Sequence, residues 1–471
     1  MKRIFNFEDQ NAFAKLSGDY NPIHIDKIAA RRMIFGMPIV HGIHALLWCL
    51  DSWLMGKTKI LLLNSINVYF NKPIGLDEEV SLLINNESKR CVRIDLLNCD
   101  LIVMMSVIIR WDSLKIQDLP LPLNYFPEKF PPRMVLTDDI IGKSGELDLY
   151  LNVKAATKNF PNLLACISPL QIAVFLSLSR LVSVECPGLH SLFSELSLSF
   201  RNNLDYKYLN YEITNYNKKL SLVFIKVKSP IMTGQIRAFH RPNTLKQESY
   251  KKLKDLVSST EFTGWRAMLI GGSRGLGEVC AKLLAAGGAE VLLTYNKGKE
   301  DALYIVDDIN KNGGVAKCLH FDVLSIKHQN FISSLNNWFP THLFYFATPF
   351  IFSGVKGVFS TDQFNKFCHY YVNGFQNCTN ILINLGLRNI FYPSTLAISE
   401  LQTNMSEYTV AKTAGEMLCL FLQKNNSDLK IYKPRLPRMS TDQTVTLFPI
   451  KNEDPVPIML RHLQAFQSIS K

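Results

Sequence analysis

The segment AMLIGGSRGLGEVCAKLLAAGGAEVLLTYN, residues 267–296, decides the fold of the C-terminal part of the chain. An apolar strand leads into a glycine-rich turn, a helix and a second apolar strand, which is how a parallel α/β domain begins. Backbone amides at the start of such a helix can bind a pyrophosphate. We predict a doubly wound parallel sheet that starts near residue 262; the alternative is a merely tight turn.

The glycine-rich turn and the end of the second strand supply candidate dinucleotide-binding residues. These are Gly271, Ser273, Arg274, Gly275, Leu276 and Gly277 in the turn, with Asn296 and Lys297 after the strand. The second strand ends in LLTYNKG, without the acidic residue that holds the ribose hydroxyls in NAD-specific sites. Arg274 and Lys297 would attract a phosphate on the ribose, so we predict NADPH rather than NADH.

Tyr408 and Lys412 lie four residues apart in SEYTVAKTAGE and would share one face of a helix. An ammonium beside a phenol can lower the phenol's pKa, so that the phenol exchanges a proton with a substrate oxygen near neutral pH. Alone, this pair would usually be a solvated helix face. Downstream of a dinucleotide-binding turn, the catalytic interpretation is favoured.

Residues 262–445 resemble the short-chain dehydrogenase/reductase family through GGSRGLGE, FDV, YVNG, FYPST and YTVAK. The resemblance implies a Rossmann-type fold, with Tyr408 as the acid or base and Lys412 as its tuner and ribose ligand. It further implies that Ser394 orients the substrate carbonyl and that Asn373 belongs to a proton relay. Asp322 and Val323 would lie near the adenine, and Ala347 would lie in a loop that contacts the cofactor.

Three departures mark an atypical branch of that family. YFATPF at residues 345–350 replaces the usual NNAG, and YKPRLPRMSTDQT differs from the usual Pro-Gly segment. Ser394 lies fourteen residues before Tyr408, where thirteen is commoner and Thr395 would fit. The substrate should therefore not be copied from the commonest members.

Near the N-terminus, residues 16–26 read LSGDYNPIHID and hold Asp19 and His24 among turn-forming residues. Glycine and proline exclude a regular helix there, so the stretch reads as a rigid loop that presents two side chains. The apolar residues of IHALLWCLDSWLMG, at 43–56, surround most of a helix and indicate burial on several sides. Strand-like runs follow, which predicts one buried helix wrapped by a sheet.

Residues 1–115 resemble the MaoC-like hydratases and dehydratases of the hot-dog fold, through the GDYNPIH core and the FGMPIVHG that follows it. The resemblance implies that Asp19 and His24 jointly handle a water or a leaving hydroxyl next to an acyl thioester, which needs two groups of different basicity. The backbone amide near Gly42, at a helix start, would stabilise the thioester oxygen. His41 and His44 are predicted to be structural, with a thioester contact as the alternative for His41.

The same order of elements returns between residues 130 and 240, where an apolar helix at 163–183 precedes ELSLSFRN and LSLVFIKVKSP. Its pre-helix segment ATKNFPNLLACISP contains neither the Asp nor the His, so this copy would be a degenerate structural partner. We thus predict a multidomain α+β and α/β protein. Its parts are a MaoC-like domain at 1–120, a degenerate second hot-dog domain at 130–240, a linker at 241–261, a reductase domain at 262–445 and a C-terminal extension at 446–471.

The composition indicates the cellular compartment of the protein and the classes of partner that it can bind. Among 471 residues, 47% are hydrophobic, and the ten cysteines form no CxxC pair and no zinc-like spacing, so we predict a reducing cytoplasm and no metal. The net charge of +12 suits acidic partners, but no basic run interleaves with aromatics, so nucleic-acid binding is not predicted. Pro169 and several serines interrupt the apolar stretch at 163–182, which favours a buried helix over a membrane span.

The two resembled families share one intermediate, since a 3-hydroxyacyl thioester is the product of a ketoreductase and the substrate of a dehydratase. We predict that NADPH reduces a 3-oxoacyl thioester and that the product is dehydrated to a trans-2-enoyl thioester, in fatty-acid or polyketide-like biosynthesis. The carrier would be coenzyme A or an acyl carrier protein, and the protein a homodimer. Two alternatives stay open: an oxidative pairing of enoyl-CoA hydratase and 3-hydroxyacyl-CoA dehydrogenase, and an acyl-binding or scaffold protein with one inactive half.

Overall fold

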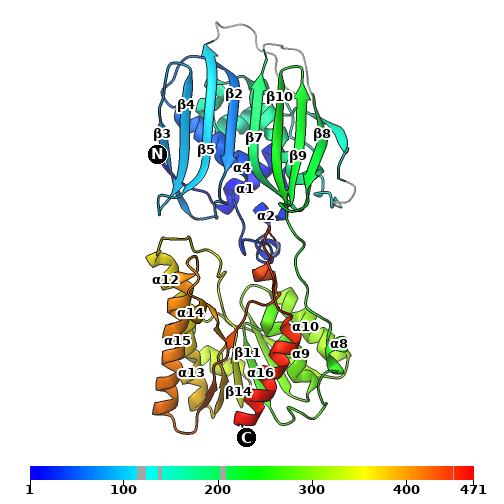
Figure 1. Cartoon of the computed structure of the whole chain (residues 1–471), viewed down its shortest axis with the longest axis vertical. Coiled ribbons are helices and arrows are strands. Elements are labelled where there is room, and N and C mark those ends of the chain that lie inside the picture. Colours follow the sequence, from blue (N-terminus) through cyan, green and yellow to red (C-terminus); the bar gives the residue numbers. More distant parts are fainter. Residues whose placement is uncertain (114–123, 136–139, 202–207, 449, 471) are drawn as a thin grey trace. The chain divides into compact units, whose positions relative to one another are not determined.

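The computed structural model of the chain describes residues 1–113, 124–135, 140–201, 208–448 and 450–470. The predicted domain boundary at residue 120 lies outside these residues. The chain divides into two units, one of Met1–Asn243 with Thr446–Pro449 and one of Thr244–Val445 with Ile450–Lys471. Figure 1 labels many of the helices and strands of both units.

Ten strands of the first unit, counted over its described residues, form one sheet in the order β1-β3-β4-β5-β2-β7-β10-β9-β8-β6. All neighbouring strands in it are antiparallel (Figure 1). The strands are β1 (Lys2–Ile4), β2 (Leu61–Phe70), β3 (Glu79–Asn85), β4 (Cys91–Asn98), β5 (Val103–Ser113), β6 (Ser144–Asp148), β7 (Ser191–Phe200), β8 (Tyr208–Asn217), β9 (Leu222–Ser229) and β10 (Met232–His240).

The second half of this sheet repeats the connectivity of the first half. Strands β2 to β5 lie in the order β3-β4-β5-β2, and strands β7 to β10 lie in the mirrored order β7-β10-β9-β8. The two halves meet at the centre, where β2 pairs with β7 and Tyr69 lies opposite Glu195. A duplicated unit of one helix and four strands would produce this order.

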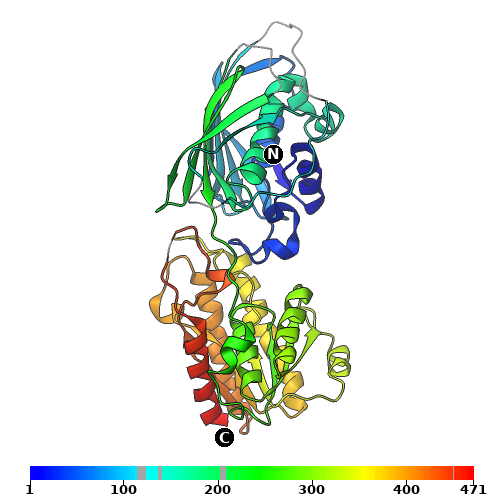
Figure 2. The same ribbon diagram turned by 90° about the vertical axis from the view of Figure 1, so that its right-hand side faces the viewer.

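The helices of the first unit cover one face of its sheet, as Figure 2 shows. The predicted continuous helix at 163–183 is divided instead, because Pro169 lacks an amide hydrogen and is accepted at the first turn of a helix rather than in its interior. The helices are α1 (Phe7–Ser17), α2 (Pro22–Ile25), α3 (Lys27–Ala30), α4 (Gly42–Leu54), α5 (Val153–Asn159), α6 (Pro161–Cys166) and α7 (Pro169–Arg180), which continues into a π-helical segment, Leu181–Glu185.

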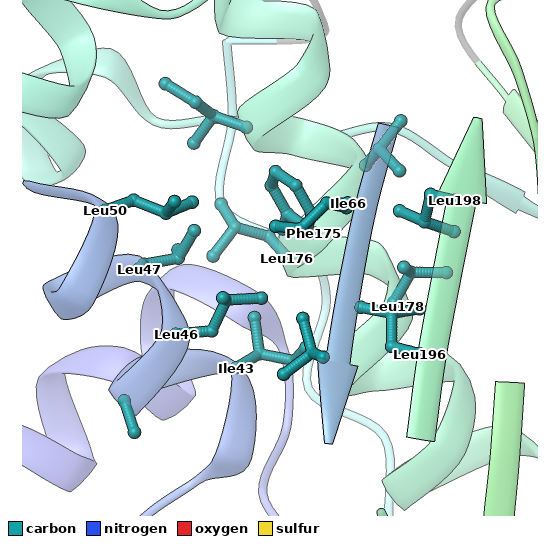
Figure 3. Packing of buried hydrophobic residues seen from close by; sticks show 14 of the residues in the cluster. Ile43, Leu46, Leu47, Leu50, Ile66, Phe175, Leu176, Leu178, Leu196 and Leu198 are labelled. Atoms are coloured by element: carbon teal, nitrogen blue, oxygen red, sulfur yellow. The ribbon is translucent and has the colours of Figure 1, made fainter. Parts of the chain in front are cut away.

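One hydrophobic core joins the two halves of the first unit. Every residue of α4 after Gly42 is buried, in keeping with a helix that is apolar on nearly all sides. Figure 3 shows side chains of α4, α7, β2 and β7 packed together, with labels on Ile43, Leu46, Leu47, Leu50, Ile66, Phe175, Leu176, Leu178, Leu196 and Leu198. The central helices of the two halves thus pack into one shared hydrophobic core.

The second unit contains a sheet of six parallel strands, counted over the described residues, in the order β13-β12-β11-β14-β15-β17. This is the 3-2-1-4-5-6 order of a dinucleotide-binding fold and confirms the predicted doubly wound parallel sheet. The strands are β11 (Arg266–Ile270), β12 (Glu290–Tyr295), β13 (Val315–His320), β14 (His342–Tyr345), β15 (Asn389–Phe391) and β17 (Lys430–Tyr432), with β16 (Ser394–Thr395) and β18 (Arg435–Leu436) paired separately.

Helices pack on both faces of this parallel sheet. In β11, Ala267 and Leu269 point into one core with α9 and α16, while Met268 and Ile270 point into another with α13 and α15. This explains why the strand is continuously apolar. The helices are α8 (Tyr250–Lys254), α9 (Gly275–Ala286), α10 (Lys299–Lys311), α11 (His328–Ser334), α12 (Thr361–Cys368), α13 (Phe375–Asn384), α14 (Ala397–Glu400), α15 (Ser406–Asn425) and α16 (Pro455–Ser470), with a π-helical segment at His369–Gly374 and a 3-10 turn at Asp442–Thr444.

Within the described part of the chain, no helix combines the length and the apolar composition needed to cross a bilayer.

Candidate functional site

The loop between α1 and α2 carries Asp19 and is tied to the second half of the first unit. Helix α1 ends at Gly18, whose φ of +78° lies in the left-handed region that glycine adopts without strain. Asn21 caps α2, and its side-chain amide donates to the carbonyl oxygens of Ser183, at 3.0 Å, and Leu189, at 3.1 Å. The loop is therefore held at both ends.

Asp19 is buried, with 1% of its surface exposed. The Ser179 hydroxyl donates to its Oδ2 at 2.7 Å, and the backbone amide of Asn21 donates to Oδ1 at 3.2 Å. The Ser183 hydroxyl also acts on the carboxyl and lowers its pKa. Burial raises the pKa of the carboxyl, while His24 and these donors oppose that rise. The carboxyl thus takes up a proton more readily than an exposed aspartate does.

His24, on α2, faces the same cavity as Asp19. Its Nδ1 lies 2.8 Å from the Ile39 carbonyl oxygen and so donates to it, which leaves the lone pair of a neutral ring on Nε2. Burial lowers the pKa of His24, and Asp19 opposes that change. His24 can therefore serve as a neutral proton acceptor beside a buried carboxyl.

His41 and His44 fix the start of α4. His41 Nδ1 lies 2.8 Å from Gln10 Oε1, and its Nε2 lies 3.0 Å from the Asp19 carbonyl oxygen. His44 stacks on Phe13 with ring centroids 4.7 Å apart. These contacts agree with the structural roles predicted for both histidines.

Asp19, His24 and His41 are also candidate metal ligands, because one ligand atom from each lies within 4.8 Å of the others. However, both nitrogens of His41 already face oxygen atoms of the chain, and so does His24 Nδ1. A metal ion would have to displace these contacts. This donor set does not favour a metal.

A cavity of about 150 Å³ opens beside Asp19, His24 and Gly42. Gly42 begins α4, so its amide lacks an intrahelical partner, and a Cβ there would lie 2.8 Å from Phe70 Cε1. The walls come from both halves of the unit and include Phe35, Phe70, Met104, Met105, Phe193 and Phe239. The structure thus places all three predicted residues at one apolar cavity.

The glycine-rich turn of the second unit begins at Gly271, whose φ is +82°. A Cβ there would lie 2.7 Å from the Ala347 amide nitrogen, so only glycine fits. A Cβ on Gly277 would overlap the Gly271 carbonyl oxygen, which shows how closely α9 approaches the end of β11. Since α9 begins at Gly275, its first amides are available at the turn, as a pyrophosphate would require.

Arg274, in the same turn, forms an ion pair in which its Nη1 lies 2.8 Å from Asp442 Oδ2. The two side chains are 19% and 3% exposed, so the arginine has a buried partner within the unit. Asn296 and Lys297 are exposed just after β12. Of the two predicted phosphate-attracting residues, Lys297 is the exposed one.

The remaining predicted cofactor residues lie at the ends of parallel strands or beside the turn. Asp322, after β13, accepts a bond from the Leu324 amide at 3.0 Å, and Val323 beside it is buried. Ser273 is buried in the turn, and Leu276 lies in the first turn of α9. Their positions suit the predicted roles, which stay predictions.

Tyr408 and Lys412 lie on α15, both buried. Lys412 Nζ donates to the Pro393 carbonyl oxygen at 2.7 Å and lies 4.1 Å and 4.9 Å from the ring centres of Tyr371 and Tyr392. Burial lowers the pKa of Lys412 to about 7 and raises the pKa of Tyr408 to about 12. The expected lowering of the Tyr408 pKa by Lys412 is thus not found: burial raises this pKa, and Thr395 is the residue that opposes the rise.

The two neighbouring hydroxyls of β16 have different partners. The Thr395 hydroxyl acts on the Tyr408 phenol and lowers its pKa, against the rise that burial causes. Ser394 instead donates to Glu416, which also accepts two bonds from Arg435 at 2.9 Å and 2.8 Å. The structure therefore brings Thr395 to Tyr408, in the place expected of Ser394. Thr395 is the residue at the commoner spacing.

Asn373, the predicted relay residue, is exposed on the π-helical segment His369–Gly374. Tyr371 from the same segment is buried and meets the Tyr408 ring edge-on, with centroids 5.7 Å apart. The Tyr371 hydroxyl lies 2.5 Å from Thr348 Oγ1. The structure therefore brings Tyr371, and not Asn373, to Tyr408 and Lys412.

Sequence reasoning missed Ser179, Ser183 and Tyr371. The two serines lie four residues apart in a largely apolar stretch that also holds Ser177 and Arg180, and this spacing puts them on one helix face. That shared face could have marked them. For Tyr371 the signal was weaker, because YYVNG offers three polar side chains with nothing to rank them.

Comparison with known proteins gives a family match for the N-terminal part. Residues 4–97 match the family model described as MaoC like domain. The (R)-specific enoyl-CoA hydratase of Aeromonas caviae is 37% identical over 86 residues, which are 17% of this chain and 61% of the relative. Elsinochrome reductase 1 of Elsinoe fawcettii is 38% identical over 71 residues, 15% of this chain and 27% of the relative.

The chain thus covers less than two thirds of the length of either of these relatives. Among solved structures, a dehydrogenase/reductase from Sinorhizobium meliloti matches with a TM-score of 0.39 and 19% identity. That match covers 46% of this chain and 94% of the other.

Proposed function

We propose a bifunctional acyl-thioester enzyme, on the premise that residues 4–97 of this chain are a MaoC-like domain. The first unit would remove water from a 3-hydroxyacyl thioester, and the second would produce that thioester by reducing a 3-oxoacyl thioester. The observation that carries the proposal is the apolar cavity at which Asp19, His24 and Gly42 meet. An acyl chain fits such walls, and the polar groups lie where its thioester end would be.

Dehydration needs a base and an acid, and burial moves the pKa values of the two candidates in opposite directions. His24 Nε2 would take a proton from the second carbon of the acyl chain. The bond between the third carbon and its hydroxyl then breaks, and the hydroxyl takes a proton from Asp19 and leaves as water. The amide of Gly42 would donate to the thioester oxygen as negative charge develops there.

The repeated strand order supports a second proposal, that residues 130–240 are a degenerate second hot-dog domain. The segment before α7 contains α5 and α6 and lacks the Asp and His pair. This copy would close the cavity and complete the core. One active site per pair of copies follows.

The second unit has residues that fit a nicotinamide dinucleotide. Gly271, Gly275 and Gly277 with the first amides of α9 would hold the pyrophosphate, beside the side chains of Thr441 and Asp442 that lie next to Gly275. When bound, the cofactor supplies the hydride. Exposed Lys297 and the lack of an acidic residue at the end of β12 support NADPH over NADH, and Arg274 would join only if it left Asp442.

For the reduction, Thr395 would orient the substrate carbonyl and Tyr408 would give its proton to the carbonyl oxygen. Lys412, held at the Pro393 carbonyl, would stabilise the phenolate that Tyr408 becomes. The roles of Ser394 and Asn373 in this step stay predictions.

The exposed Lys297 and the lack of an acidic residue at the end of β12 support the reductive order, in a fatty-acid or polyketide-like biosynthesis. Coenzyme A or an acyl carrier protein would carry the acyl group, and a homodimer in the cytoplasm stays our prediction. The oxidative pairing of hydratase and dehydrogenase uses the same residues, so the direction must be measured.

The test is NADPH consumption with a short 3-oxoacyl thioester, followed by mass spectrometry of the product. We expect a product lighter by one water than the hydroxyacyl thioester. Asp19→Asn should stop the reaction at the hydroxyacyl stage, and Tyr408→Phe should stop NADPH consumption. Efficient oxidation of the hydroxyacyl thioester by NAD without use of NADPH would contradict the reductive order, and unchanged turnover in either variant would support a scaffold role for that half.

A further inference from the structure

Two serines from the second half of the first unit contact the carboxylate of Asp19. We propose that Ser179 and Ser183 are positioning residues that hold and orient this carboxylate for the dehydration step, a proposal that rests on the function proposed for the cavity. The second half would then complete the active site and not only the core.

The contact joins residues that are far apart in the chain. Ser179 Oγ donates to Asp19 Oδ2 at 2.7 Å across 160 positions, and both side chains are buried. Ser183 lines the same cavity as Asp19 and lowers the pKa of its carboxyl, and the Ser183 backbone carbonyl accepts from the Asn21 side chain at 3.0 Å. The end of α7 thus fixes both the carboxylate and the loop that carries it.

The local helix geometry explains how both hydroxyls reach one carboxyl. Ser179 lies in the last turn of α7, and Ser183 lies in the π-helical segment Leu181–Glu185 that continues it. Residues four apart lie on one face of a helix. The other residues of that segment are mostly apolar and buried, so the two serines form a polar spot aimed at the cavity, whose wall they line.

Hydroxyl donors suit a carboxyl that must exchange protons. A neutral donor fixes the direction of the carboxylate oxygens, whereas a bonded arginine would favour the charged form more strongly and suppress proton uptake. Burial still raises the pKa of Asp19 despite the two serines. The ionisable groups around the carboxyl and its loop are His24 on α2, His41 before α4, Arg180 on α7 and Arg241 after β10.

The experiment compares Ser179→Ala with Ser177→Ala in the full chain. Ser177 is the matched control, because it is buried on the same helix but donates to the Val174 carbonyl, at 2.8 Å. Hydration of a short trans-2-enoyl thioester is followed as a function of pH. We expect about a tenfold lower kcat for Ser179→Ala, with a KM near that of the wild type. The part of the pH profile that reports the titration of Asp19 should move upward by about one pH unit.

The pH profile of Ser177→Ala should coincide with that of the wild type. The profile of Ser179→Thr, which keeps the hydroxyl, should lie close to the wild-type profile. The proposal is overturned if Ser179→Ala keeps the wild-type profile, or if Ser177→Ala moves it equally. If wild-type protein hydrates no enoyl thioester and Asp19→Asn changes nothing, the proposed function fails instead.

If the protein shows no hydratase activity, a stability measurement still decides whether Ser179 holds the Asp19 carboxylate. A carboxyl with a raised folded pKa contributes stability at low pH that is lost as the pH rises through that pKa. Loss of the Ser179 bond raises the pKa of Asp19 further, so the Tm deficit of Ser179→Ala relative to wild type should grow with pH over the carboxyl range. A deficit that is the same at all pH values would overturn the proposal.

Discussion

Thr395 and Ser394 are adjacent on β16, yet the Thr395 hydroxyl acts on the pKa of Tyr408 while the Ser394 hydroxyl donates to Glu416. We therefore expect Thr395→Val to lower the kcat of ketone reduction by roughly 100-fold or more, as loss of a donor beside a reacting oxygen does. Ser394→Ala should change kcat only a few-fold, because Glu416 keeps Arg435 as its partner. The opposite order of the two effects, measured by NADPH consumption, would return the role to Ser394.

Lys412 provides a pH-dependent test at the residue scale, because burial lowers its pKa from an ordinary value of 10.5 to about 7. A lysine with a lowered folded pKa contributes stability that is present above the unfolded pKa and is lost as the pH falls through the folded pKa. The free energy of unfolding of wild type should therefore fall relative to Lys412→Met between about pH 10 and pH 7. Denaturant titrations of both proteins over that range would show it, and a parallel pH dependence would contradict it.

At the element scale, α15 has one face in the core and one in solvent. Its core face carries Tyr408 and Lys412, while Val410, Met417, Leu420 and Phe421 are 47–57% exposed and recur at helical spacing. An exposed apolar stripe of this kind is typical of a protein interface. It supports α15 as the site of the predicted homodimer.

Phe421→Glu should convert the homodimer to a monomer without loss of helix content, since it places a charge in the middle of that stripe. Tyr304→Glu on α10 is the matched control, because Tyr304 is an aromatic residue that is 68% exposed on another helix. Light scattering coupled to size-exclusion chromatography measures both masses. A wild-type monomer, or an unchanged dimer in Phe421→Glu, would exclude α15 as the interface.

At the scale of the whole molecule, the two units have separate sheets and separate cores. Each proposed activity uses residues of one unit only. The two steps should therefore be separable by mutation and joined again through the free 3-hydroxyacyl thioester.

We expect an equimolar mixture of Asp19→Asn and Tyr408→Phe to restore the conversion of the 3-oxoacyl to the enoyl thioester, although neither variant completes it alone. The intermediate released by one chain would enter the intact first unit of the other. Mass spectrometry over time would follow both products. If the mixture forms no enoyl thioester although Asp19→Asn still reduces and Tyr408→Phe still dehydrates, the intermediate does not leave the chain on which it forms.

Several features were within reach of the sequence because they depend on residues close together. The turn from Gly271 to Gly277 and the stretch from Asp19 to His24 each lie within a short segment. The loop predicted for the second stretch holds at Asp19 but not at His24, because Pro22–Ile25 form the short helix α2. The helix predicted at 163–183 was too long, because Pro169 begins a new helix.

Other features depend on segments that only folding brings together. The contact of Ser179 with Asp19 spans 160 positions, and local spacing did not rank Tyr371 over Asn373. The commoner spacing did point to Thr395, although Ser394 was the residue predicted. The pKa directions of Tyr408 and Lys412 follow from burial, which is a property of the packed unit. The sequence by itself thus determined the two folds and the loops that carry the chemistry, because backbone preferences act locally. Only the tertiary structure decided which side chains face those loops and how strongly they hold a proton, because desolvation and long-range contacts arise on packing.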